Sequence, residues 1–335
     1  MDPEQRLNRA LHLILMPTEA CNFRCVYCYE RFEHHRMKPA VVRGVKNLMS
    51  RRAQELDRLG VSWFGGEPLL ARDVIEEVML HAHSLKEKQP GLLVAGDMTT
   101  NAYLLDRDCF ERLLDLGVTH LQIAFDGPPE HHDHKRVLAG GKGTFDRIWK
   151  NILSCRDVDR TFEILVRVHV DRENAGDIPA FLDRYREALA NDGRFRLFLR
   201  PLSRLGGAMD HTIPVLEGEK ADAILSSLRA RARGDRSAAH PGLRPPEIPS
   251  VCYAAKPHSF LVRADGRLNK CTVALEHPNN QVGRLREDGS MEIDSSKMGP
   301  WIRGLFSANP HELRCPMEGY AEPEPQTASV VSMRA

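Results

Sequence analysis

The sequence lacks three features that would each point to a particular class of protein. Its 47 basic and 46 acidic side chains leave a net charge of +1, so no strong field of one sign attracts nucleic acid or a membrane surface. No apolar run is long enough for a membrane span or a signal-peptide core, and "LHLILM" at residues 11–16 is instead typical of a buried strand. No internal repeat is present. We therefore expect a cytoplasmic protein without nucleic-acid or membrane partners.

Short apolar runs alternate with helix-period stretches over roughly the first two-thirds of the 335 residues, which predicts an α/β fold with a parallel sheet. Six such units joined by right-handed crossovers would curl into a partial (β/α)6 barrel of the TIM type. In such barrels the chemistry lies on loops at the carboxyl ends of the strands. The predicted strands are residues 11–16, 61–64, 92–98, 121–125, 163–170 and 196–199.

The composition also predicts the domain boundaries. The barrel would occupy residues 1–231, with a helix between 105 and 118 that starts at the N-cap Asp106 and ends at Gly117. A Pro-, Gly- and Ser-rich linker would follow at 232–250, and then a smaller unit of hairpin-like pieces at 251–320 with a turn at Asp265 and Gly266. Residues 321–335 are typical of a disordered tail.

Three cysteines share one short loop after the first predicted strand, in "EACNFRCVYCYERF" at residues 19–32. In a cytosolic chain, cysteines serve more often as metal ligands or core residues than in disulfides. Cys21, Cys25 and Cys28 could hold three irons of a cubane iron–sulfur cluster and leave the fourth iron open. They could also bind zinc with His34 or His35 as a fourth ligand, or be buried free thiols. The spacing alone does not decide among these.

A second loop, "WFGGEPLL" at residues 63–70, follows the second predicted strand. Paired glycines allow a ligand to approach the backbone closely, and a carboxylate at the rim of a site can bind an ammonium group. On its own, a Gly-Gly-Glu pattern is more often a plain turn. Together, however, "CNFRCVYCY" and "FGGEPLL" resemble the radical S-adenosylmethionine superfamily, in which both motifs occur in this order.

The resemblance implies an activity and its cofactors. Cys21, Cys25 and Cys28 would hold a [4Fe–4S] cluster whose open iron chelates the amino and carboxylate groups of S-adenosylmethionine. Reductive cleavage of that cofactor would give methionine and a 5′-deoxyadenosyl radical, which removes a hydrogen atom from an unactivated C–H bond.

The resemblance also implies the residues that bind S-adenosylmethionine. Tyr27 would lie at the adenine, Gly65 and Gly66 at the methionine end, and Glu67 at the ammonium group. The other expected contacts are Thr100, Asn101, Asp126, Arg136 and, from "RPLSRLGG", Leu199 or Arg200. Ala124 departs from the pattern, because the family usually has a serine there.

Other residues are expected to be structural. Cys109 and Cys155 lie among apolar neighbours in helical patterns and should be core residues. We interpret His131, His132 and His134 as the exposed start of a helix rather than a metal site.

A second set of cysteines lies in the C-terminal part. Cys252 and Cys271 frame a C-x13-G-x4-C pattern around Gly266, and Cys315 follows. This resembles the SPASM or shorter twitch extension, and implies one auxiliary [4Fe–4S] cluster. Glu318, a distant cysteine or the substrate would complete its ligands. A degenerate remnant or a zinc site is the alternative.

Family members with such an extension mostly modify peptides, so the leading hypothesis is an enzyme that crosslinks a ribosomally synthesised precursor peptide. The expected partners are that peptide, a reductant such as flavodoxin or ferredoxin, and a separate leader-binding protein, because only about ten residues precede the first strand. One alternative is a radical dehydrogenase of a small molecule or of a protein side chain. A non-catalytic iron–sulfur electron carrier is the alternative from another class.

Overall fold

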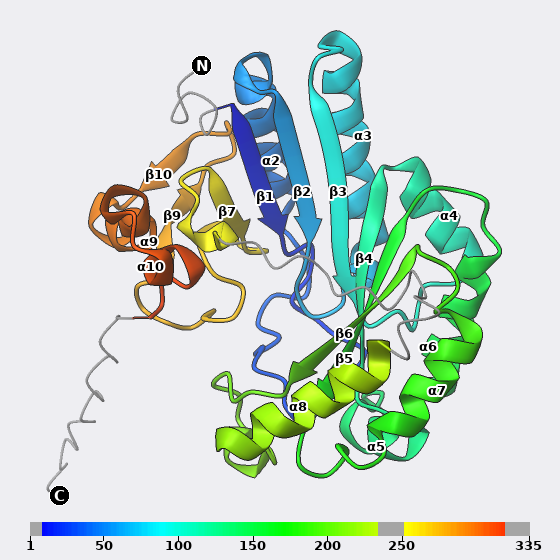
Figure 1. Cartoon of the computed structure of the whole chain (residues 1–335). Coiled ribbons are helices and arrows are strands. Elements are labelled where there is room, and N and C mark those ends of the chain that lie inside the picture. The colour runs from blue at the N-terminus through cyan, green and yellow to red at the C-terminus, as the bar shows by residue number, and fades with distance from the viewer. Residues whose placement is uncertain (1–8, 234–250, 319–335) are drawn as a thin grey trace, which may run out of the picture.

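The computed structural model describes residues 9–233 and 251–318. Six parallel strands lie side by side in chain order, and each of the six predicted strands is present (Figure 1). The strands β1 and β6 are not paired with each other in the described parts of the chain, so the barrel stays open. The predicted α/β fold with a partial barrel is confirmed. The six strands are β1 (Ala10–Leu15), β2 (Arg58–Trp63), β3 (Leu93–Thr100), β4 (Val118–Phe125), β5 (Glu163–Val170) and β6 (Phe195–Pro201).

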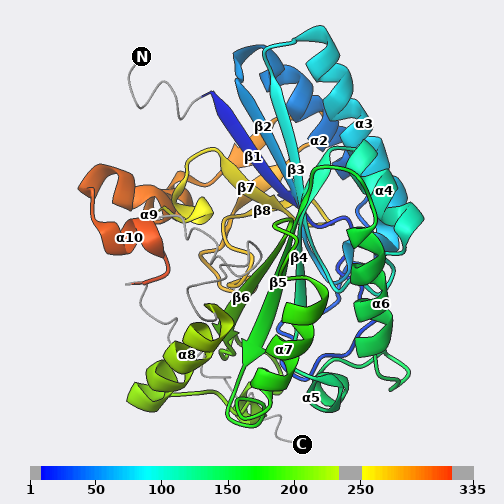
Figure 2. The ribbon, with the colours of Figure 1, turned by 45° about the vertical axis from the view of Figure 1, so that its right-hand side comes forward.

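Helices connect these strands, and α3, α4, α6 and α7 lie along the outer side of the sheet (Figures 1 and 2). Each turns an apolar stripe toward the sheet and leaves charged residues outside. The helix α4 begins as predicted, because the Asp106 side chain accepts a hydrogen bond from the Cys109 amide at 2.9 Å. The helices of this part are α2 (Pro39–Arg52), α3 (Arg72–Lys88), α4 (Arg107–Asp115), α5 (Pro129–Lys135), α6 (Phe145–Arg156), α7 (Ile178–Ala188) and α8 (Gly218–Arg233).

The C-terminal unit continues the same sheet. Its first strand, β7, pairs in parallel with β1, a pairing that the sequence did not predict. The other strands follow in antiparallel order, and the predicted turn is confirmed because Gly266 has a φ of +91° between β7 and β8. The elements are β7 (Ser259–Val262), β8 (Arg267–Asn269), β9 (Gln281–Leu285), β10 (Met291–Ile293), α9 (Ser295–Ser307) and α10 (Pro310–Arg314).

Two predicted segments lie largely outside the described residues. The predicted linker 232–250 overlaps α8 at its first two positions, and the rest of it, like the predicted tail 321–335, is not described. Within the described ranges, no helix has both the length and the hydrophobicity that a membrane span requires.

Candidate active site

The loop that carries the first three cysteines follows β1 and is held by its neighbours on two sides. The amides of Arg24 and Val26 donate to the carbonyls of Val137 and Lys135 at 2.8 and 3.0 Å. On the other side, the Glu67 amide donates to the Ala20 carbonyl at 2.9 Å. These bonds fix the loop at the carboxyl ends of the parallel strands, where the barrel was predicted to place its chemistry.

The three thiols of this loop lie near one another and are free. Burial raises the pKa of the Cys21 and Cys28 thiols to about 12, and it also raises the pKa of Cys25. Such thiols stay protonated at neutral pH unless a cation binds them, because only a bound metal stabilises several thiolates in one buried place.

The spacing of the sulfurs separates a cluster from a single zinc ion. Four sulfurs around one zinc ion, each about 2.3 Å from it, lie roughly 3.8 Å apart. In the described residues, the one group of three Cys, His or carboxylate ligand atoms that all lie within 4.8 Å is Glu19, Glu33 and His34. Neither set of three thiols meets this limit in the described residues, so neither forms a compact site for a single ion as it stands.

His34 does not complete a zinc site with the thiols. Its Nε2 lies 3.2 Å from Arg267 Nη2 and 3.4 Å from the Asp265 carboxylate, so it faces the C-terminal hairpin. Arg263 and Arg267 also balance the charge of Glu19 and Glu33, so this group needs no bound cation.

The two glycines after β2 pack directly against the cysteine loop. A Cβ on Gly66 would lie 2.4 Å from the Ala20 carbonyl oxygen, and one on Gly65 would lie 2.3 Å from the Thr18 oxygen. Gly65 also has a φ of +111°, which disfavours any side chain. The two glycines therefore allow the backbone of the cysteine loop to lie directly against the loop after β2. This packing role is separate from any contact with a ligand.

Replacing Gly66 with alanine should displace residues 19–21 and weaken cluster binding. We expect a loss of about 1–3 kcal/mol in the free energy of unfolding of the apo-protein, as for other overpacked sites. Chemical denaturation and the iron content after reconstitution measure the two effects. Gly140→Ala is the matched control, because its Cβ would meet nothing within 4 Å. Equal iron content in both variants would contradict this role of Gly66.

Glu67 is buried rather than at an exposed rim, so that part of the expectation is wrong. Its carboxylate accepts hydrogen bonds from the Thr100 hydroxyl and the Asn101 amide, both at 2.7 Å, and from the Leu69 amide at 3.0 Å. Burial raises the pKa of this carboxyl, and these bonds act in the opposite direction. Glu67 thereby joins the loop after β2 to the end of β3.

Asn101 connects the same network to the first cysteine. Its Nδ2 donates to Asn22 Oδ1 at 2.8 Å and lies 3.8 Å from Cys21 Sγ. Three of the predicted cofactor residues, Glu67, Thr100 and Asn101, thus support the cysteine loop from behind. Their direct contact with S-adenosylmethionine stays a prediction.

Asp126, Tyr27 and Arg136 meet as the resemblance implies, and the structure adds His169 to them. The Tyr27 hydroxyl donates to Asp126 Oδ2 at 2.8 Å and accepts from Arg136 Nη1 at 2.9 Å. His169 Nδ1 lies 2.9 Å from Asp126 Oδ1. Burial alone would raise the pKa of Asp126, but the hydrogen bond from His169 and the nearby positive charges lower it to about 2.

The sequence signal for His169 is the alternation of polar and apolar residues in β5. In "EILVRVHV" the apolar residues alternate with Arg167 and His169, which places both polar side chains on one face of β5. Because the helices cover the other face, these two side chains point into the open barrel.

The Leu199 side chain does not face this site, and a contact of this residue with S-adenosylmethionine stays a prediction. The parallel register pairs it with Val168, and both are buried on the face that packs against the helices. Arg200, the alternative from the same segment, pairs with His169 and therefore lies on the inner face. The turn after β6 also reaches the cysteines, since a Cβ on Gly207 would lie 2.5 Å from the Cys28 oxygen.

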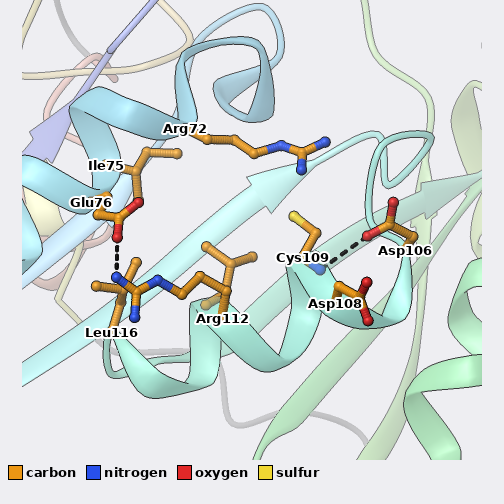
Figure 3. A pocket seen from close by; sticks show the side chains of 9 residues that line it. Arg72, Ile75, Glu76, Asp106, Asp108, Cys109, Arg112 and Leu116 are labelled. Atoms are coloured by element: carbon orange, nitrogen blue, oxygen red, sulfur yellow. Dashed lines mark hydrogen bonds and ion pairs between the residues drawn. The ribbon is translucent and has the colours of Figure 1, made fainter.

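Of the predictions for the remaining histidines and cysteines, one is wrong and two are confirmed. His132 is wrong as an exposed residue, because it is buried and its Nε2 lies 3.1 Å from the Thr144 hydroxyl. Cys109 and Cys155 are buried in the core, as predicted. Cys109 also lines a cavity of about 400 Å³ between α3 and α4 (Figure 3). This cavity lies among the outer helices, away from both thiol sets.

The second set of thiols comes together from three separate segments. Cys252 precedes a short helical turn, Cys271 follows β8, and Cys315 follows α10. The Cys252 amide donates to the Leu313 carbonyl at 2.7 Å, which brings the first and third segments together. Burial raises the pKa of the Cys252 thiol, and the nearby Cys271 and Cys315 raise it further. The set is thus assembled by the fold, as the spacing predicted.

A buried ion pair joins the two thiol-bearing regions. Arg263 Nε and Nη2 each lie 2.9 Å from a Glu19 oxygen, and Nη1 lies 3.0 Å from Glu276 Oε1. The Arg263 and Glu19 side chains are each 2% exposed. Since Glu19 lies two residues before Cys21 and Glu276 five after Cys271, Arg263 fixes the two regions relative to each other.

Comparison with known proteins agrees with this geometry. A model of the Radical SAM superfamily matches residues 15–222, more than half of the chain. The chain therefore belongs to the radical SAM superfamily. Members of this superfamily use a [4Fe–4S] cluster and S-adenosylmethionine, and three free thiols in one loop supply the ligands for such a cluster.

Two curated relatives show the range of similar proteins. Fe-coproporphyrin III synthase of Methanosarcina barkeri is 24% identical over 170 residues, which are 51% of this chain and 39% of that protein. PqqA peptide cyclase of Bradyrhizobium diazoefficiens is 34% identical over 121 residues, 36% of this chain and 30% of that protein. The chain thus spans less than half the length of these relatives.

Two solved structures share the fold over most of the chain. The protein anSMEcpe, with bound AdoMet and the Cp18Cys peptide, has a TM-score of 0.65 at 18% identity, covering 87% of this chain and 80% of that one. Streptococcus suis SuiB, bound to the precursor peptide SuiA, has a TM-score of 0.58 at 13% identity, covering 90% and 68%.

Proposed function

We propose that this chain cleaves S-adenosylmethionine reductively and uses the 5′-deoxyadenosyl radical to modify a ribosomally synthesised peptide, by C–H activation and crosslink formation. The observation that carries the first part is the set of three half-buried free thiols in one loop. All eight cysteines of the chain are described, and neither Cys109 nor Cys155 leaves the core to act as a fourth ligand. One iron of a bound cluster would therefore stay open to the cofactor.

The residues around the thiols would position the cofactor. When bound, the cluster supplies one electron to the sulfonium, and the radical that results removes a hydrogen atom from the substrate. Arg136 has a buried Nε with no hydrogen-bond partner in the described residues, and it would bind the carboxylate of S-adenosylmethionine. Tyr27 and the ionised Asp126 would lie beside it, and Gly65, Gly66 and Glu67 would border the methionine end.

We further propose that residues 251–320 form an auxiliary-cluster unit of the SPASM or twitch type. Cys252, Cys271 and Cys315 would hold an auxiliary [4Fe–4S] cluster. Glu318 is exposed and its side chain has no partner in the described residues, so either it or the substrate would complete the ligands.

A peptide is the substrate class that the comparisons support best. The matched cyclase is named for its PqqA peptide, and both solved structures hold a peptide. The proposed partners are a precursor peptide, a reductant such as flavodoxin or ferredoxin, and a separate leader-binding protein.

Anaerobic reconstitution with iron and sulfide, followed by dithionite and S-adenosylmethionine, tests the proposal. We expect 5′-deoxyadenosine and methionine in equal amounts, measured by liquid chromatography and mass spectrometry. An electron carrier or a zinc protein would form neither.

Replacing Cys271 with alanine should remove the auxiliary cluster alone. We expect the iron content to fall from about eight to about four atoms per chain, while cleavage of S-adenosylmethionine continues without a substrate. Iron analysis and Mössbauer spectroscopy measure the change. Cys109→Ala is the control, because it removes a buried thiol from the helix layer. Unchanged iron in the Cys271 variant would exclude the auxiliary cluster.

A further inference from the structure

Two arginines face the interior of the barrel from neighbouring strands without an acidic partner. Arg167 lies on β5, and Arg200 lies on β6 opposite His169, so both side chains leave the sheet on its inner face. Within residues 9–233 and 251–318, neither guanidinium lies within ion-pair distance of a carboxylate. Most other charged side chains near the site do have such partners, as the buried pairs Lys135–Asp171 and Arg263–Glu19 show.

Arg167 is the more unusual of the two. Its Nε is buried and has no hydrogen-bond partner in the described residues. Burial lowers the pKa of this guanidinium, and the neighbouring charge of Arg200 lowers it further. A buried guanidinium nitrogen without a hydrogen-bond partner is costly for the fold, so its presence points to a ligand that supplies an acceptor and a negative charge.

Arg167 lies deeper on β5 than His169, but it is still close enough to Tyr27 and Arg136 to interact with them electrostatically. His169, at the end of β5, reaches Tyr27 and Asp126. Arg167 lies two residues earlier on the same face, roughly 6.6 Å deeper in the barrel. Arg136, by contrast, follows α5 and interacts with Tyr27 and Cys25. Arg167 therefore shares the inner face of the sheet with His169 and Arg200 but lies one pleat below His169.

We propose that Arg167 and Arg200 form a subsite for a carboxylate of the peptide substrate, and this rests on the proposed peptide-modifying function. A guanidinium binds a planar carboxylate through two parallel hydrogen bonds, which gives both affinity and a fixed orientation. The subsite would hold an acidic side chain or the C-terminal carboxylate of the peptide, and so place a neighbouring C–H bond at the radical.

Binding of defined peptides to the reconstituted holoprotein, in the presence of S-adenosylmethionine, tests this inference. The probes are three pools of fluorescein-labelled decapeptides. The first has two fixed aspartates and an amidated C-terminus, and the second, neutral pool has asparagines at those positions and an amidated C-terminus. The third has the same asparagines and a free C-terminal carboxylate. We expect one carboxylate pool to bind about tenfold more tightly than the neutral pool. Which one does so identifies the source of the carboxylate.

Variants assign the preference to the two arginines. Arg167→Gln and the exposed Arg200→Gln should each reduce the preference to less than about threefold, and Arg167→Lys should restore part of it. Arg160→Gln is the control, since Arg160 pairs with Asp115 on the outer surface. Affinity for S-adenosylmethionine and iron content should not change in the Arg167 and Arg160 variants.

Each contrary result overturns the inference. Equal binding of the three pools excludes the carboxylate subsite. So does the absence of binding by any pool at a peptide concentration of about 1 mM, which would detect even a weak complex. If Arg167→Gln weakens the affinity for S-adenosylmethionine about tenfold, Arg167 binds the cofactor instead. If the variant protein contains less iron, Arg167 balances the charge of the cluster. Formation of 5′-deoxyadenosine is measured in the same preparation and tests the proposed function. A preparation that forms 5′-deoxyadenosine but shows no carboxylate preference would contradict the subsite alone.

Discussion

Replacing Cys25 with alanine should abolish cleavage of S-adenosylmethionine. The loop offers three thiols at the site, and the loss of one leaves two sulfurs for a cluster that needs at least three protein ligands to stay bound and correctly oriented. Cys25 would be the middle ligand, and its carbonyl accepts the Cys28 amide at 3.1 Å in the turn that shapes the loop. We expect 5′-deoxyadenosine formation to fall by at least about a thousandfold, since no other route to the radical exists without the cluster.

The measurement is single-turnover formation of 5′-deoxyadenosine under anaerobic conditions, with the reconstituted wild type alongside. Cys109→Ala is the matched control, because Cys109 is a buried cysteine whose pKa is likewise raised by burial, but it lies in the helix layer. Activity retained in the Cys25 variant, or lost equally in the Cys109 variant, would contradict the assignment of the ligands.

Replacing Arg263 with methionine should destabilise the apo-protein by about 3–5 kcal/mol, because it leaves Glu19 as a buried charge without its partner. Glu19 and Arg263 are each 2% exposed, so water cannot compensate. The ion pair also joins the loop of Cys21 to the hairpin that carries Cys271. We therefore expect both cluster sites to lose order, with less iron per chain after reconstitution.

Denaturant unfolding of the anaerobic apo-protein measures the first effect, and iron analysis measures the second. Arg286→Met is the control, because Arg286 pairs with Glu292 on the surface, where such pairs contribute little. Double replacement of Arg263 and Glu19 by methionine and leucine should recover much of the lost stability. A single Arg263 variant as stable as the control would mean that the pair does not hold the two regions together.

The elements that the sequence predicted are those set by short-range patterns. The six strands follow from apolar runs, and the N-cap of α4 follows from one aspartate before an apolar helical stretch. The thiol sets could be predicted because the cysteine loop and the Gly-Gly-Glu loop together resemble the radical S-adenosylmethionine superfamily, whereas their spacing alone left other metals open. The hairpin at Gly266 follows from one Asp-Gly turn.

The rest depended on contacts between distant segments. Nothing local in β7 shows that it pairs in parallel with β1, since that register depends on the packing of the whole C-terminal unit. The burial of Glu67 could not be predicted, because the groups that cover its carboxylate come from the end of the neighbouring strand β3. The sequence does not decide between Leu199 and Arg200, because the face that a residue takes changes at every position of a strand and depends on the register.

The central claim is that one incompletely ligated iron lies at the loop of Cys21, Cys25 and Cys28. An anaerobic crystal structure with S-adenosylmethionine, phased on the anomalous scattering of iron, tests it most directly. The account predicts a [4Fe–4S] cluster held by these three sulfurs, with the fourth iron bound to the amino and carboxylate groups of the cofactor. A metal coordinated entirely by protein ligands, or three sulfurs turned away from one another without metal, would contradict it.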